Sequence, residues 1–140
     1  MAIVQTQCTI FKTNLLSGLE NFAVGTAYTY KIALYTANAA LDATTTAYST
    51  TNEITGTGYT AGGQVLTIIP PASGGTTAYV SFNNVTWTPA SFTTRGALIY
   101  NSTTGAAVAV LNFGSDKIAT NTFTVTFPTA DASNAIIRIS

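Results

Sequence analysis

From residue 28 onward, apolar residues recur at every second position of short segments. Over residues 28–34, a tyrosine or a branched aliphatic residue alternates with threonine, lysine and alanine. Successive side chains of a β-strand point to opposite faces, so this period of two predicts a strand with one strongly apolar face. The same pattern predicts further strands at residues 64–69, 77–82, 85–88, 95–100, 106–113, 122–127 and 135–139.

Turn-forming residues separate these segments at intervals of about ten residues, a spacing typical of sandwiches and jelly rolls. Asn101-Ser-Thr-Thr-Gly105 predicts a hairpin turn in which the glycine supplies a positive φ. Pro70-Pro71-Ala-Ser-Gly-Gly75 predicts a break between strands, and Asn83-Asn84 predicts a bulge. We expect an all-β fold, a β-sandwich or jelly roll of about eight strands, in a single domain over residues 1–140.

The N-terminal part of the chain lacks this period. Residues 1–12 are expected to form either an extended arm or a first strand. Apolar residues then recur at helical spacing over Leu15–Phe22, where Thr13 or Asn14 can cap and Gly25 can end a helix. This pattern predicts one short N-terminal helix.

Residues 36–63 are rich in Thr, Ala, Ser, Asn and Gly and contain too little apolar surface for a core of their own. Because a loop of this length is usually functional, we expect an extended arm that contacts neighbouring subunits, with one short strand near Glu53 and Ile54. Aromatic side chains are enriched at interface cores, and glycines permit sharp turns. The predicted interface residues are Tyr35, Tyr48, Tyr59, Gly56, Gly58, Gly62 and Gly63.

Charged residues make up only 7% of the chain, and five basic residues balance five acidic ones. Threonine, with 28 residues, supplies much of the polarity, and its hydroxyl is cheaper to bury than an ion. So little charge favours association, and we expect a homo-oligomer, a dimer or trimer. The basic residues are dispersed, which predicts no nucleic-acid binding, and no apolar run suggests a secretory signal or a membrane span.

The residue types needed for most catalytic and metal chemistry are scarce. There is no histidine, and Cys8 is the single cysteine. This removes the commonest general base, the usual zinc ligand, an internal disulfide and a thiolate cluster within one chain. The carboxylates form no pair on one element, and turn capping accounts for Asp42, Asp116 and Asp131. We expect no catalytic residue, no metal site, no cofactor and no enzyme activity.

The aromatic residues allow two interpretations. Seven Tyr, seven Phe and Trp87 fall mostly at alternating positions, which favours core packing. The alternative is a receptor- or carbohydrate-binding module in which exposed Tyr and Trp87 stack on sugars. The predicted core residues are Ile32, Leu34, Val80, Phe82, Trp87, Leu98, Val110, Phe123, Val125 and Ile137.

Several segments together resemble a family of small structural proteins of tailed bacteriophages and prophages. The most specific block is Gly56-Thr-Gly-Tyr-Thr-Ala-Gly-Gly63, and the helical stretch Leu15–Phe22 is similar to the amphipathic N-terminal segment of that family. The resemblance covers most of residues 11–139. The matching segments are Tyr30–Thr36, Leu41–Tyr48, Glu53–Gly63, Val85–Trp87, Phe92–Asn101, Ala107–Lys117 and Phe127–Asp131.

The resemblance implies a virion structural protein made in the cytoplasm of the host bacterium, and it transfers no catalytic residue. Within the virion, a capsid decoration (cement) protein on the head surface is expected, which binds copies of itself and the major capsid protein or another virion protein. The alternative location is the neck, the tail or a fibre.

Overall fold

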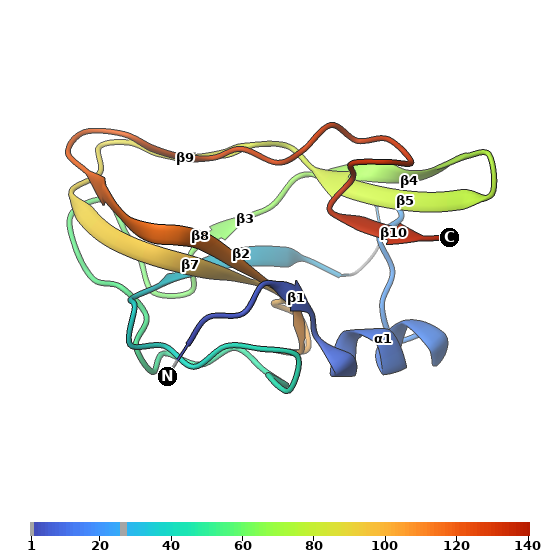
Figure 1. The fold of residues 1–140 in the computed structure, drawn as a ribbon, viewed down its shortest axis with the longest axis horizontal. Helices are drawn as coiled ribbons and strands as arrows, with labels where there is room; N and C mark the ends of the chain where they lie inside the picture. The colour runs from blue at the N-terminus through green and yellow to red at the C-terminus, as the bar shows by residue number, and fades with distance from the viewer. Residues whose placement is uncertain (1, 26–27) are drawn as a thin grey trace.

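A computed structural model describes residues 2–25 and 28–140 and shows an all-β architecture with three antiparallel sheets and one short helix (Figure 1). The helix is α1 (Thr9–Leu16), and the strands are β1 (Thr6–Gln7), β2 (Tyr30–Tyr35), β3 (Gln64–Val65), β4 (Ile68–Gly74), β5 (Thr77–Phe82), β6 (Val85–Trp87), β7 (Phe92–Asn101), β8 (Ala107–Ala119), β9 (Phe123–Val125) and β10 (Ile137–Ile139). The all-β prediction is confirmed.

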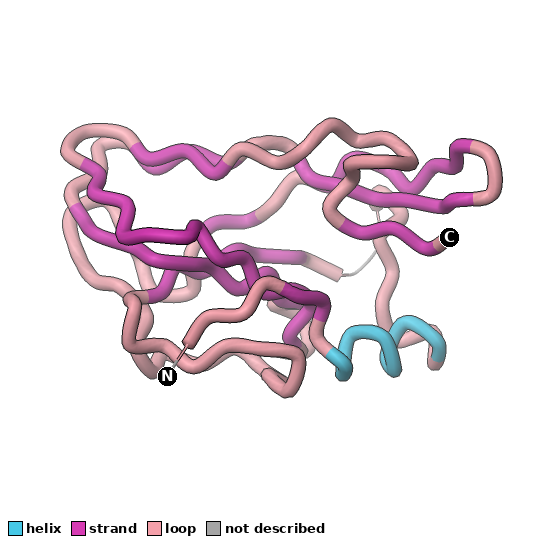
Figure 2. Tube along the Cα trace, in the orientation of Figure 1, coloured by secondary structure: helices cyan, strands magenta, loops and turns pink. Residues whose placement is uncertain are grey.

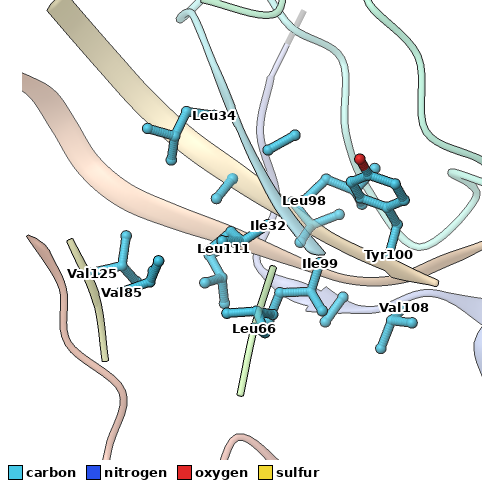
Figure 3. Close-up of a cluster of buried hydrophobic side chains, with 14 of the residues drawn as sticks. Ile32, Leu34, Leu66, Val85, Leu98, Ile99, Tyr100, Val108, Leu111 and Val125 are labelled. Atoms are coloured by element: carbon cyan, nitrogen blue, oxygen red, sulfur yellow. The ribbon is translucent and has the colours of Figure 1, made fainter. Parts of the chain in front are cut away.

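The sheets form the two layers of a sandwich (Figures 1 and 2). One layer is a five-stranded sheet in the order β1-β8-β7-β2-β3. The other layer consists of the pair β6-β9 and the three-stranded sheet β10-β5-β4. Apolar side chains of both layers meet between them, among them Leu34, Val85 and Val125 (Figure 3). This shared apolar core is the main source of stability in such a fold.

The hairpin that joins β7 to β8 forms as predicted. Gly105 adopts φ +86°, and its N–H donates to the carbonyl oxygen of Asn101 at 2.7 Å. The side-chain oxygen of Asn101 accepts a hydrogen bond from the backbone N–H of Thr103 at 3.0 Å. Local turn chemistry therefore sets this connection, as expected for Asn and Gly at these positions.

The predicted helix over Leu15–Phe22 is wrong in position, because α1 begins at Thr9 and ends at Leu16. Phe11 is fully buried, so packing against the sandwich selects the earlier turns. Gly18, at φ +72°, ends the helix in a Schellman motif: the N–H of Leu19 donates to Asn14 O at 2.8 Å, and that of Gly18 to Leu15 O at 3.3 Å. Gly25 is therefore not the stop.

The segment 1–12 is neither a free arm nor one continuous strand. Its residue 1 lies outside the described part of the chain. Residues 6 and 7 form β1 and pair with Val110 and Ala109 of β8, after which the helix begins. Cys8 lies at that junction and is fully buried.

Two predicted breaks instead lie inside strands. β4 runs through Pro70 and Pro71, with a register shift between Ile69 and Ala72. β4 is an edge strand of its sheet, where the missing proline N–H groups cost no ladder hydrogen bond. The turn that would place Asp116 as a cap is also absent, since this residue lies in β8 and pairs with Arg95 at 3.6 Å.

The predicted core is confirmed apart from Phe123, which is half-buried. β2 is buried on both faces, because Ala33 and Tyr35 are covered as completely as Ile32 and Leu34. The prediction that only one face of this strand is apolar and buried is therefore wrong. The second face is covered by segments that follow β2 in the chain, and period-two alternation does not report such coverage.

Candidate functional site

Residues 36–63 cross the outside of the five-stranded sheet as a long connection with little regular structure (Figure 2). The short strand predicted near Glu53 and Ile54 is reduced to a single antiparallel bridge between Tyr35 and Glu53. A further bridge joins Ala47 to Ala106. The segment is thus attached to the sandwich at several separate points.

The Glu53 carboxylate is the centre of these attachments. Its Oε1 accepts a hydrogen bond from Tyr48 Oη at 2.6 Å. Its Oε2 accepts from Tyr59 Oη and from the backbone N–H of Gly62, the latter at 2.8 Å. The hydroxyl of Tyr59 in turn accepts from the backbone N–H of Leu34 in β2, at 3.0 Å. The network therefore connects residues 48–62 to the central sheet.

Two further tyrosines extend the network. Tyr35 Oη donates to Ser49 O, and Tyr100 Oη donates to Gly62 O, both at 2.7 Å. The ring of Tyr100 stacks on that of Tyr48 with centroids 4.6 Å apart. Burial first, and then the Glu53 carboxylate, raise the pKa of Tyr48 and of Tyr59 well above the ordinary tyrosine value. Both hydroxyls therefore remain protonated donors at any physiological pH.

Two glycines let the segment lie directly on the sheets. A Cβ on Gly63, at φ +77°, would lie 1.7 Å from Ile32 O, and one on Gly58, at φ +86°, would lie 1.8 Å from Pro89 O. No other residue type fits such a close backbone approach. The glycine pattern of this segment thus reflects contacts within the subunit.

The predicted interface residues are therefore engaged inside the subunit to different degrees. Tyr35 is 1% exposed, so the structure leaves it no surface for a partner. Tyr48, Tyr59 and Gly63 are half-buried, Gly62 is buried, and Gly56 and Gly58 are exposed. The segment is held on its own subunit by its tyrosines, and its contact with neighbouring subunits stays a prediction.

An apolar groove lies elsewhere, where α1 and the residues that follow it approach the three-stranded sheet. Its volume is about 260 Å³. Leu15 and Phe22 contribute one wall, and Val80, Ile137 and Ile139 contribute the other. Figure 1 shows α1 near β10 at the end of the molecule where the C-terminus lies. This groove was not predicted, because it depends on how the helix and β10 pack.

The chain segments that form this groove also carry large exposed apolar side chains. Seven of the described residues have a large exposed apolar side chain, and of these Ile139 lines the groove. Three more, Leu16 (90% exposed), Leu19 and Val24, directly adjoin a lining residue in sequence. Single exposed apolar residues are ordinary, but an apolar groove formed by segments that expose several of them is typical of an interaction site. The groove and these four residues are called the α1–β10 surface below.

One charged side chain lines the groove. Glu20 is 7% exposed, and its Oε1 accepts hydrogen bonds from Tyr30 Oη at 2.9 Å and from Asn101 Nδ2 at 2.8 Å. Its Oε2 is buried and has no hydrogen-bond partner. In the sequence, Glu20 is one of five carboxylates, and no local pattern predicts that it is buried.

The other acidic residues have local roles. Asp42 caps the turn before Thr44, and Asp131 caps the turn at Ser133 and Asn134. Hydrogen bonds donated to these carboxylates lower the pKa of each below its ordinary value. Within residues 2–25 and 28–140, no three His, Cys, Asp or Glu residues lie close enough together to hold a metal ion.

Trp87 does not form a sugar-stacking platform. It is 1% exposed and packs against the rings of Tyr59, Phe92 and Phe123, with centroids 6.0–6.5 Å apart. Core packing is therefore the correct interpretation for this residue.

Among the described helices, none is long and apolar enough to cross a membrane. Comparisons with protein-family models, with curated proteins and with solved structures found no significant match to this chain.

Proposed function

We propose that this chain is a non-catalytic structural subunit of a tailed-phage virion, and that it docks onto neighbouring subunits through the α1–β10 surface. The observation that carries the proposal is an apolar groove lined by exposed Ile139, whose other wall comes from a chain segment that also exposes Leu16, Leu19 and Val24. In a free subunit this groove exposes apolar surface to water, and in an assembly the same surface is buried against a neighbour.

The energetics favour binding by burial over binding by charge. Full burial of a leucine-sized side chain contributes about 1.5–3 kcal/mol. Charged residues make up only 7% of the chain, and Arg95–Asp116 is the ion pair among the described residues. Few ions therefore have to be desolvated when the subunit is covered.

A role in head decoration is the more specific form of this proposal; the resemblance over residues 11–139 bears on virion membership and not on the location. A decoration subunit is repeated many times by the symmetry of the head. Contacts of about 800 Å² per partner, repeated around the shell, then resist internal pressure without one very strong contact. The neck, the tail or a fibre is the alternative location for the same docking mechanism.

Quantitative mass spectrometry of gradient-purified particles tests the proposal. Hundreds of copies per particle support head decoration, whereas a few copies support the neck, tail or fibre. Absence of the chain from the particles overturns virion membership.

A matched pair of variants tests the surface. Leu16→Gln removes the most exposed apolar side chain of the α1–β10 surface, and Ile118→Thr removes a 74% exposed apolar side chain of β8 outside it. We expect Leu16→Gln to reduce incorporation into particles at least tenfold, and Ile118→Thr to incorporate like the unmodified chain. Equal incorporation of both variants would show that docking uses another surface.

A further inference from the structure

Glu20 is the only charged residue among the buried residues of the described chain, and only one of its two carboxylate oxygens accepts a hydrogen bond. Both of its hydrogen-bond donors, Tyr30 and Asn101, bind Oε1, and Oε2 has none. A buried carboxylate oxygen without a partner is rare in folded proteins because it loses its water without compensation. Such an oxygen calls for a specific donor.

The described residues of the chain do not supply that donor. No lysine or arginine among the described residues forms an ion pair with Glu20, and the ion pair that these residues do form joins Arg95 to Asp116. Glu20 nevertheless lines the same groove as Leu15, Phe22 and Ile137. The residue with the unpaired buried oxygen is therefore also one of the residues that line the apolar groove.

We propose that the groove binds the side chain of a lysine from a neighbouring protein subunit. The methylene stem of the lysine packs on the apolar walls, and its ammonium group donates to Glu20 Oε2. Lysine combines these two parts, because its long stem is apolar and its charge is confined to the tip. The inference rests on the proposed function for the source of that lysine, but the chemistry of the groove is testable without it.

Lysine fits this site better than arginine does. A guanidinium group binds a carboxylate most strongly when both oxygens accept from it side by side. Oε1 of Glu20 already accepts from two donors, so one oxygen remains. A compact ammonium needs only one. Oε2 is covered in the structure, so the incoming side chain has to displace part of the apolar wall to reach it.

The experiment titrates the full ¹⁵N-labelled chain with n-pentylammonium, followed by heteronuclear NMR. The matched ligands are 1-pentanol, which keeps the stem without charge, and pentanoate, which reverses the charge. We expect saturable shifts at the amides of Leu15, Ala23 and Ile139, with the ammonium binding at least tenfold more tightly than the alcohol and the pentanoate more weakly still. Equal binding of ammonium and alcohol would overturn the proposal, as would shifts at exposed carboxylates alone.

Two variants assign the preference to Glu20. Glu20→Gln keeps an oxygen for Tyr30 and Asn101 but removes the charge, and we expect it to lose the tenfold preference while it still binds the alcohol. Asp116→Asn removes an exposed carboxylate away from the groove and should keep the preference. If Glu20→Gln does not fold, the ligand series on the unmodified chain still decides the question.

This result and the particle analysis can fail independently. A chain that prefers the ammonium but is absent from purified particles supports the groove chemistry and overturns the proposed function. A chain present in particles whose groove shows no such preference overturns the lysine inference alone.

Discussion

Tyr59→Phe removes a single oxygen atom at the point where residues 36–63 are attached to β2. That oxygen donates to Glu53 Oε2 and accepts from the backbone N–H of Leu34 at 3.0 Å. Leu34 is fully buried, so water does not replace the lost acceptor. The phenylalanine ring keeps the contacts with Trp87 and Phe92. The variant therefore isolates the hydrogen bonds from the packing.

The expected loss of stability follows from the two bonds. A hydrogen bond to a charged group contributes about 1.5–3 kcal/mol, and a buried N–H left without a partner costs about 1–3 kcal/mol. The two effects share one atom and do not add fully, so we expect about 2–4 kcal/mol less free energy of unfolding. Tyr48→Phe loses only the bond to Glu53 Oε1, and about 1.5 kcal/mol is expected.

Urea denaturation followed by the fluorescence of Trp87 measures these differences. Tyr79→Phe is the control, because the hydroxyl of this half-buried tyrosine forms no hydrogen bond with the described residues, and a change within about 0.5 kcal/mol is expected. Amide hydrogen exchange at Leu34 should accelerate in Tyr59→Phe and not in the control. If Tyr59→Phe and Tyr79→Phe unfold at the same urea concentration, the network does not stabilise the segment and the reasoning is refuted.

Three further predictions follow from other residues. The pKa values of Asp42 and Asp131 are lowered in the folded state, so their stabilising effect is complete above the ordinary value of 3.8 and is lost as the pH falls below it. The free energy of unfolding, measured as a function of pH, should fall below this value, and Asp131→Asn should make the fall smaller. An unchanged fall in the variant contradicts the capping role. Burial raises the pKa of the Cys8 thiol to about 11, so a thiol reagent at pH 8 should label it only after denaturation, and rapid labelling of the native chain contradicts its position. Gly63→Ala should lower the free energy of unfolding by about 1–3 kcal/mol or more, because its Cβ meets Ile32 O. Gly75→Ala, also at positive φ but with free space, should cost less, and equal losses would contradict the close approach.

Strands and local turns were accessible from the sequence because their causes are local. The period of two places the apolar residues of β2. Asn101 and Gly105 define the hairpin between β7 and β8 by the residues of the turn alone. The passage of β4 through Pro70 and Pro71 was not accessible, since it depends on β4 being an edge strand.

The helix shows a different limit. Leu15, Leu19 and Phe22 fit a helical period, but the burial of Phe11 selects the earlier turns. Gly18 did carry the local signal for the end of α1, as the left-handed residue of a Schellman motif. The position of a short helix thus depends on tertiary packing more than on its own periodicity.

The candidate site divides in the same way. Aromatic and glycine residues mark 35–63 as unusual in the sequence, but only the fold shows that Glu53 accepts from Tyr48 and Tyr59 within the subunit. The α1–β10 surface joins residues that are more than 100 positions apart, such as Leu15 and Ile139. No pattern along the chain predicts that these residues line one groove. The unpaired carboxylate oxygen of Glu20 is likewise visible only in the fold.

The most direct test of the docking account is a cryo-electron microscopy map of the intact particle at a resolution that shows side chains. The account predicts that a neighbouring subunit covers the α1–β10 surface, that Leu16 and Ile139 are buried by it, and that residues 36–63 keep their contacts with Glu53. A map in which the chain is present and this surface faces solvent would contradict it.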